Sequence, residues 1–178
     1  MDVVEAIHKR RSIRSFLAKP VDRKLIESVI CDAAQAPPPF QGRVPWTFNV
    51  VQGVDRIAEL DKRAMDYARA HHRSTNGDNS WLERPDFRAF WGAPAVIVIS
   101  GAAEDCVRAG QNLMLSAVSR GLGTCWVGSP MLWLSADEGK AEFGIPPELT
   151  PVSAFCIGYP RSIPEMSQKV RPPIIWAD

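Results

Sequence analysis

The chain has 178 residues, of which 46% are hydrophobic and 23% are charged, and these values fit one globular domain over residues 1–178. Its 21 Lys and Arg nearly balance its 20 Asp and Glu, and the formal net charge of +1 gives no field that would attract nucleic acid or an anionic membrane. No apolar run approaches the roughly 20 residues of a membrane span. The first residues are acidic and amphipathic, unlike a secretory signal, so we expect a cytoplasmic protein.

Helix and strand signals alternate from the N-terminus. Asp2 and Glu5 read as a capping box that opens a short helix ending near Lys9. Asp22 caps a second amphipathic helix, which must end before the prolines at 37–39 because proline lacks the amide donor that a helix needs.

The rest of the chain predicts further helices and strands. Apolar periodicity indicates helices at 54–72, 104–120 and 135–143, and strands at 47–53, 93–101, 124–128 and 152–160. The β-branched run at 93–101 is typical of a strand buried on both faces. We expect a small central sheet covered by helices, of α+β or mixed α/β type.

The cysteines and histidines do not suggest a metal site. The four cysteines are widely separated, lie in apolar stretches and lack a CxxC spacing, so we expect buried, reduced thiols at Cys31, Cys106, Cys125 and Cys156. His71 and His72 are adjacent, and on a helix they would point about 100° apart. We expect no metal.

The stretch HKRRSIRSF (8–16) crowds cations beside hydroxyls. In an extended chain Arg10, Ser12 and Arg14 alternate onto one side, while Ile13 turns toward the core. Arginine and a serine hydroxyl are the donors that an anion such as a phosphate needs. The competing interpretation is a basic helix end that complements the helix dipole.

Five stretches, in this order and spacing, resemble the nitroreductase family of FMN enzymes. They are AIHKRRSIRSF (6–16), AAQAPPPFQGRVPW (33–46), AGQNLMLSAVSRGLGTCWVG (109–128), FCIGYP (155–160) and KVRPP (169–173). The resemblance implies a nitroreductase-like fold, with a central, mostly antiparallel sheet of four to five strands flanked by helices. It also implies a homodimer in which the C-terminal arms are exchanged and FMN lies at the interface.

The resemblance assigns cofactor-binding residues. Those implied at the phosphate and the flavin edge are Arg10, Ser12, Arg14, Lys169 and Arg171, with Arg11 counted beside them although the alternation turns it away. Those implied around the flavin ring are Pro38, Pro39 and Gln41 on one wall, and the backbone of Gly128 and Ser129 near N5 and O4. An ordinary strand-ending turn is the alternative at Gly128.

The stretch PPPFQGRV departs from the family pattern. Prolines stand where the family has serines, Gln41 where it has asparagine, and Arg43 where it has glutamine, while Val44 is an insertion. The departure puts the flavin hydrogen bonds of those hydroxyls in question. It motivates one alternative, a flavin-binding module without turnover.

Aromatic residues are the candidates for substrate contact. The loop at 73–90 is the expected lid, and the substrate candidates are Phe40, Trp81 and Trp133. Core or interface packing is the competing interpretation for each of them. The apolar tail at 174–176 would be exposed unless it docks, and we expect it to clasp a second subunit. Packing on its own chain is the alternative.

The function that the resemblance implies is an FMN-dependent NAD(P)H oxidoreductase. NADH or NADPH would pass a hydride to flavin N5, and a nitroaromatic, quinone or related acceptor would then take its place in a ping-pong exchange. No catalytic side chain is required. Other reactions of the family remain alternatives, namely flavin destruction, dehalogenation and heterocycle oxidation. A non-flavin interaction protein is a further alternative, in which the basic stretches are solvated charge.

Overall fold

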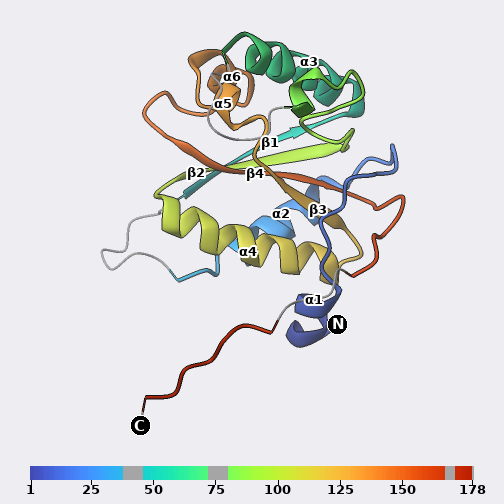
Figure 1. Ribbon diagram of the computed structural model, residues 1–178, viewed down its shortest axis with the longest axis vertical. Helices are drawn as coiled ribbons and strands as arrows, with labels where there is room; N and C mark the ends of the chain where they lie inside the picture. Colours follow the sequence, from blue (N-terminus) through green and yellow to red (C-terminus); the bar gives the residue numbers. More distant parts are fainter. Residues whose placement is uncertain (38–45, 72–79, 167–170, 178) are drawn as a thin grey trace.

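A four-stranded antiparallel sheet forms the middle layer of the computed structural model, which describes residues 1–37, 46–71, 80–166 and 171–177 (Figure 1). The strands are β1 (Trp46–Gln52), β2 (Ala95–Gly101), β3 (Gly123–Val127) and β4 (Pro151–Gly158), in the spatial order β1-β2-β4-β3. The prediction of a mostly antiparallel sheet flanked by helices is confirmed. β2 is central and almost wholly buried, as its β-branched run predicts.

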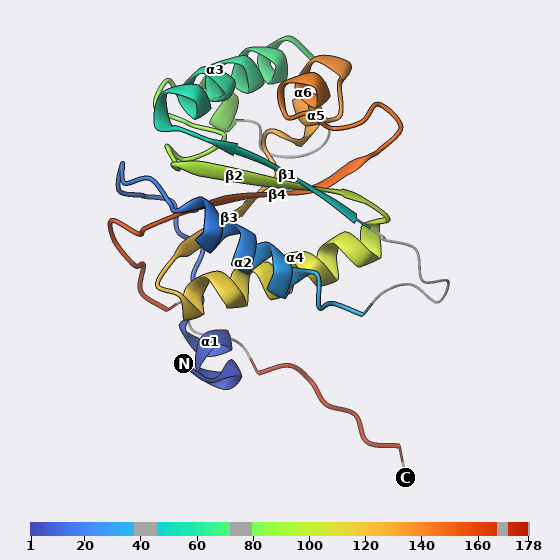
Figure 2. The same ribbon diagram turned by 180° about the vertical axis from the view of Figure 1, so that it is seen from behind.

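Helices cover both faces of this sheet, and each face has its own core. The upper layer in Figure 1 consists of α3 (Val54–His71), the single turn η1 (Ser80–Glu83), α5 (Met131–Leu134) and α6 (Asp137–Glu142). The lower layer consists of α2 (Arg23–Ala33) and α4 (Ala103–Ser119), and Figure 2 shows them side by side beneath the sheet. Alternate residues of β2 enter the two cores, Val96 and Val98 above, Ile97 and Ile99 below.

The N-terminal segment joins the sheet at its edge. α1 (Val3–Lys9) is capped by Asp2, whose carboxylate accepts the Glu5 amide at 2.8 Å, as the capping box predicts. Beyond α1 the chain is extended, and the Ile13 amide donates to the carbonyl of Thr124 in β3 at 2.9 Å. The Ile13 side chain is buried, as predicted, over Gly123, where an added Cβ would lie 2.5 Å from it.

The helix expected at 135–143 is present as α6, and α5 is a further short helix just before it. The two lie so close together that a Cβ at Gly139 would be 2.1 Å from the Trp133 carbonyl. One expectation and one alternative need correction. Cys31 is exposed on α2, whereas the other three cysteines are buried as expected, and all four are free. The apolar tail does not pack on its own chain, since Ile175 is 92% exposed.

The C-terminal segment at 171–177 leaves the body of the protein as an extended arm (Figure 1). Trp176 is 84% exposed in this arm. Among the described residues, no helix is both long and apolar enough to cross a membrane.

Candidate functional site

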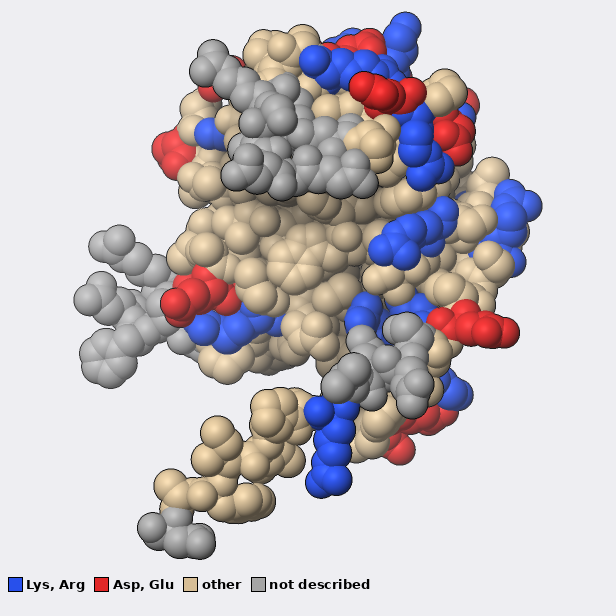
Figure 3. All heavy atoms as spheres, viewed as in Figure 1, with Lys and Arg blue, Asp and Glu red and all other residues tan. Residues whose placement is uncertain are grey.

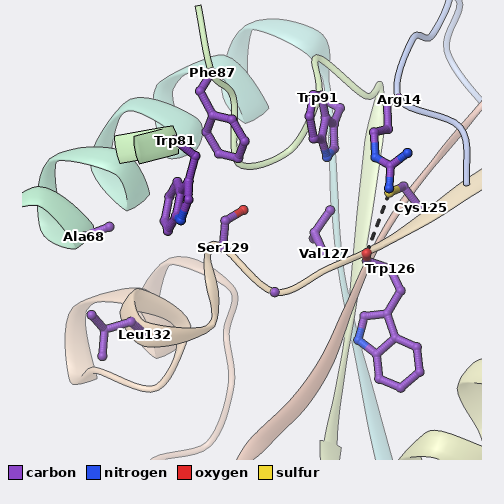
Figure 4. A pocket seen from close by; sticks show the side chains of 11 residues that line it. Arg14, Ala68, Trp81, Phe87, Trp91, Cys125, Trp126, Val127, Ser129 and Leu132 are labelled. Atoms are coloured by element: carbon purple, nitrogen blue, oxygen red, sulfur yellow. Dashed lines mark hydrogen bonds between the residues drawn. The ribbon is translucent and has the colours of Figure 1, made fainter. Parts of the chain in front are cut away.

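A hollow of about 460 Å³ opens where the N-terminal segment, the loop before β2 and the end of β3 meet. We call it the aromatic hollow (Figure 4). Its lining residues are Arg14, Ala68, Trp81, Phe87, Trp91, Cys125, Trp126, Val127, Gly128, Ser129 and Leu132. Most of this lining is apolar, so the hollow suits a flat apolar molecule rather than a sugar or a peptide backbone.

Three aromatic side chains form one wall of the aromatic hollow. The rings of Trp81 and Phe87 lie 5.0 Å apart, and those of Phe87 and Trp91 lie 5.4 Å apart. Figure 4 shows all three pointing toward the end of β3. Tilted and edge-on contacts at these spacings stabilise the wall beyond simple burial.

The opposite wall is the backbone at the end of β3. Val127 and Ser129 face the aromatic wall in Figure 4, whereas the indole of Trp126 turns away and packs 5.4 Å from Phe155. A Cβ added at Gly128 would meet no heavy atom within 4 Å, so this glycine borders open space. β3 ends at Val127, and Pro130 follows as the N-cap residue of α5.

Arg14 stands at one end of the aromatic hollow. Its guanidinium carbon lies 5.7 Å from the centre of the Trp91 ring. On its other side it lies against the thiol of Cys125 (Figure 4). Burial raises the pKa of that thiol, and the positive charge of Arg14 lowers the pKa only in part. Cys125 is therefore a neutral neighbour of Arg14 at pH 7.

A second hollow, of about 530 Å³, adjoins Arg14 on the side of α1, and we call it the cationic hollow. Its lining residues are Ile7, His8, Arg10, Arg11, Ser12, Arg14, Pro164, Glu165 and Met166. On the face drawn in Figure 3, Lys and Arg side chains lie near α1 and the segment after it, and others lie at the top of the view over α3. Arg14 lines both hollows, so the two adjoin at this side chain.

Arg11 differs from the expectation of a side chain turned away from the cofactor face. It lines the cationic hollow together with Arg10 and Ser12. Its Nη1 donates to the carbonyl of His8 at 2.6 Å and to the carbonyl of Arg10 at 2.8 Å. The guanidinium therefore closes the C-terminal end of α1, where a cation is also favoured by the helix dipole.

The turn that carries Trp91 is fixed by a buried carboxylate. Asp61 of α3 is 6% exposed and accepts the amide of Phe90 at 2.7 Å. Burial raises the pKa of Asp61, against the opposing effect of the amide hydrogen bonds from Phe90 and Ala89. This contact ties the loop at 88–93 to the upper layer.

The structure brings together some of the predicted site residues. Arg10, Arg11, Ser12 and Arg14 share the cationic hollow, and Arg14, Gly128, Ser129 and Trp81 share the aromatic hollow. Arg171 is exposed in the arm and is not among the lining residues of either hollow. Five further predictions, Pro38, Pro39, Phe40, Gln41 and Lys169, fall outside the described residues.

Trp133 was expected to contact substrate, and the structure contradicts this expectation. Its side chain is 0% exposed in the upper core and meets Phe143 edge-on, with ring centres 6.3 Å apart. Its neighbour Leu132, which is 43% exposed, lines the aromatic hollow instead. The short helix α5 causes the exchange, because successive residues on a helix point about 100° apart.

Sequence reasoning missed Trp91 and Asp61. The Trp91-Gly92 pair before the buried strand was a readable turn signal, since glycine after a polar loop marks a tight turn. Asp61 gave no such signal, because an acidic residue in a polar helix reads as surface. Its burial depends on the loop that packs over it.

The donor set suits one kind of ligand. The cationic hollow offers guanidinium groups and a hydroxyl to an anion, and the aromatic hollow offers two facing walls to a flat ring. Among the described residues, no group of three or more His, Cys, Asp or Glu could hold a metal ion. Fold and site together define an α+β protein able to hold a planar molecule with an anionic tail.

Comparison with known proteins identifies the family. A sequence model described as the Nitroreductase family matches residues 7–159. A protein of Methanothermobacter thermautotrophicus, named "Putative NADH dehydrogenase/NAD(P)H nitroreductase", is 32% identical over 167 residues, covering 92% of this chain and 80% of that protein. The chain belongs to the nitroreductase family.

Solved structures share its fold. A nitroreductase with bound FMN from Desulfitobacterium hafniense matches with a TM-score of 0.83 at 23% identity, covering 100% of both chains. Oxidised iodotyrosine deiodinase, bound to FMN and 3-iodo-L-tyrosine, matches with a TM-score of 0.80 at 18% identity, covering 99% of this chain and 100% of that one. At these identities the likeness establishes the nitroreductase-like fold.

Proposed function

We propose that this protein is an FMN-dependent NAD(P)H oxidoreductase that reduces nitroaromatics, quinones or related acceptors by ping-pong exchange. The observation that carries the proposal is that Arg14 lines both hollows. An anion-binding end and a flat apolar slot adjoin at one cation, as the phosphate and the ring of FMN require. Membership of the nitroreductase family supports it.

The cationic hollow would hold the phosphate. Arg10 and Ser12 supply charge-assisted and neutral donors to the phosphate, and a hydrogen bond to a charged group contributes about 1.5 to 3 kcal/mol. Arg14, which lines both hollows, would serve the flavin edge. Lys169 and Arg171 are proposed to add two further cations from the C-terminal region. Arg11 contributes to the field of the hollow while it closes α1.

The aromatic hollow would hold the ring. The ring would lie between the aromatic wall and the backbone at Gly128 and Ser129, and a second flat molecule would then stack on its open face. FMN, when bound there, supplies the redox chemistry by taking a hydride from NADH or NADPH and giving the electrons to the acceptor. The residues of this chain orient the flat partners and supply positive charge.

The decisive experiment is the visible spectrum of the purified protein. We expect a yellow protein whose released chromophore is FMN, and we expect NADH or NADPH to bleach it under anaerobic conditions. A colourless protein that also fails to bind added FMN would contradict the proposal. A yellow protein that neither reductant bleaches would support the module without turnover instead.

A matched pair of variants tests the assignment of the cations. Arg14→Ala removes the cation shared by both hollows, and Arg11→Ala removes one that is bonded to the end of α1. We expect the first to weaken FMN retention much more than the second, as measured by titration of the apoprotein with FMN. Equal losses would contradict the role of Arg14.

We also propose a homodimer in which each C-terminal arm docks on the partner. In the single chain Ile174 is 59% exposed and Ile175 and Trp176 more so, and such a run of apolar surface is unfavourable in water. Light scattering during size-exclusion chromatography should give the mass of two chains. Replacing all three residues by Ser should shift the protein toward one chain, and an unchanged dimer would contradict the docking of the arm.

A further inference from the structure

Trp91 is held in a backbone conformation that a tryptophan rarely adopts. Its φ is 54°, and it is the one residue other than glycine with positive φ among those the structure describes. Gly92 follows with φ 63°, and the Ala93 amide donates to the Phe90 carbonyl at 3.0 Å. The two central residues of this turn are thus left-handed, as in a type I′ turn, where Asn or Gly normally stands first.

The protein fixes this unfavourable conformation from several sides. The Phe90 side chain is buried in the upper core, and its amide donates to Asp61 at 2.7 Å. The Phe90 carbonyl also accepts the Cys156 thiol at 3.1 Å. A strained residue persists only where its surroundings determine it, and such residues gather at functional sites.

The strained turn places the indole of Trp91 against Arg14. The guanidinium carbon lies 5.7 Å from the ring centre, within the range of a cation–π contact. A further neighbour of Arg14 is the neutral Cys125 thiol. Glu165 lines the cationic hollow together with Arg14, but none of the ion pairs among the described residues includes Arg14. The indole ring and the thiol orient the guanidinium but leave its positive charge in place. A carboxylate partner would neutralise that charge.

We propose that Trp91 is a positioning residue that holds the guanidinium of Arg14, with its charge uncompensated, at the flavin ring's edge of the aromatic hollow. The inference rests on the proposed function and adds how this chain orients Arg14, the cation that lines both hollows. Trp91 affects FMN binding through its contact with Arg14 and not by contacting the flavin ring as part of the aromatic wall. The strain at Trp91 is retained for this contact.

The first test compares two replacements of Trp91 in the apoprotein titrated with FMN. Trp91→Phe keeps an aromatic face for the guanidinium, and Trp91→Leu keeps apolar bulk without one. From the strength of cation–π contacts we expect Leu to weaken FMN binding about three- to thirtyfold. Phe should stay within about threefold of the natural protein. Equal binding by the two variants would overturn the proposal.

The second test is a double-mutant cycle with Arg14→Met. If Trp91 acts through Arg14, Trp91→Leu should cause no further loss once the guanidinium is gone. The matched control is Phe87→Leu, which alters the same wall but should weaken binding by the same factor with or without Arg14. An undiminished effect of Trp91→Leu beside Arg14→Met would overturn the proposal. Where Arg14→Met binds too weakly to titrate, the Phe and Leu comparison decides.

Riboflavin, which lacks the phosphate, tests where the guanidinium acts. We expect Trp91→Leu to weaken riboflavin and FMN binding by the same factor, because the charge serves the ring edge. A loss confined to FMN would overturn that placement. If the natural apoprotein binds no FMN at all, the proposed function fails; if it binds FMN and the Trp91 variants bind equally well, only this inference fails.

Discussion

The two faces of the sheet are built from the same materials but differ in regularity. The lower layer is two helices laid across the strands, with a core in which Leu113 and Phe155 are fully buried. Among the described residues α4 also buries a carboxylate, Asp105, which pairs with Arg108 of the same helix. In the upper layer the buried carboxylate of Asp61 instead holds the loop that carries the strained turn at Trp91. Departures from local rules concentrate at functional sites, and here they adjoin the aromatic hollow. The lower layer thus stabilises the fold, and the upper layer contains the unfavourable features that shape the site.

Removing bulk from the lower layer should give the largest loss of stability. Leu113→Ala deletes a fully buried side chain of α4, and we expect the free energy of unfolding to fall by about 2 to 5 kcal/mol in urea titrations. FMN affinity should not change while the protein is folded. Val107→Ala is the matched control on the same helix, where the side chain is 41% exposed and the loss should be small. A parallel loss of FMN affinity in Leu113→Ala would contradict the division of roles.

The reactivity of the cysteine thiols gives a second comparison of the two layers. Burial raises the pKa of Cys106, in the lower layer, from 9.0 to about 11, which lowers its thiolate fraction about a hundredfold. The pKa of Cys156 in the upper layer is also raised, by its complete burial. We expect a thiol reagent at neutral pH to modify only the exposed Cys31, so Cys31→Ser should leave the native protein unlabelled. Labelling at Cys125 in that variant would show that the aromatic hollow opens more widely.

The upper layer should respond to Asp61 in both stability and binding. Asp61→Ala leaves the buried Phe90 amide without its acceptor, and such a loss costs about 1 to 3 kcal/mol. Because that amide lies in the Trp91 turn, FMN affinity should fall as well. Asp61→Asn retains an oxygen acceptor and should preserve most of both. If Asp61→Ala binds FMN as tightly as the natural protein, the Trp91 turn does not contribute to FMN binding.

The sequence predicted the regular parts of this fold because local chemistry determines them. The caps at Asp2 and Asp22 both accept the predicted amides, and the β-branched run at 95–101 is the buried central strand. These features depend on neighbours within a few residues. The sequence predicted that Ile13 is buried. It did not predict the hydrogen bond from the Ile13 amide to β3, because the sequence does not specify the partner strand.

The site was predictable only where its residues repeat a family pattern. The family resemblance assigned Arg10, Ser12 and Arg14 to the cofactor, with support from their alternate spacing, and the structure places them in one hollow. The prediction for Trp133 was wrong. In the short helix α5, a shift of one residue decides whether a side chain faces the aromatic hollow or the upper core. Trp91 was missed, since its importance arises from contact with Arg14, which is 77 positions earlier in the chain.

The smallest expected effect is the pH dependence that Asp61 confers on the upper layer. Burial raises its pKa above the ordinary 3.8, so between those two values the folded protein holds a proton that the unfolded chain has released. Stability from this group is therefore greatest at low pH and declines as the pH rises through the raised pKa. Glu5, Glu59 and Asp86, whose pKa values are lowered by ion pairs, act in the opposite direction.

The contribution of Asp61 is isolated by subtraction. The free energy of unfolding is measured by urea titration at several pH values for the natural protein and for Asp61→Asn, which has no carboxyl group at this site. The exposed carboxylates contribute equally to both proteins and cancel in the difference. We expect the natural protein to lose stability relative to Asp61→Asn as the pH rises above 3.8. A difference of the opposite sign would mean that the amides of Phe90 and Ala89 outweigh burial, and that the upper layer carries no electrostatic cost at its turn.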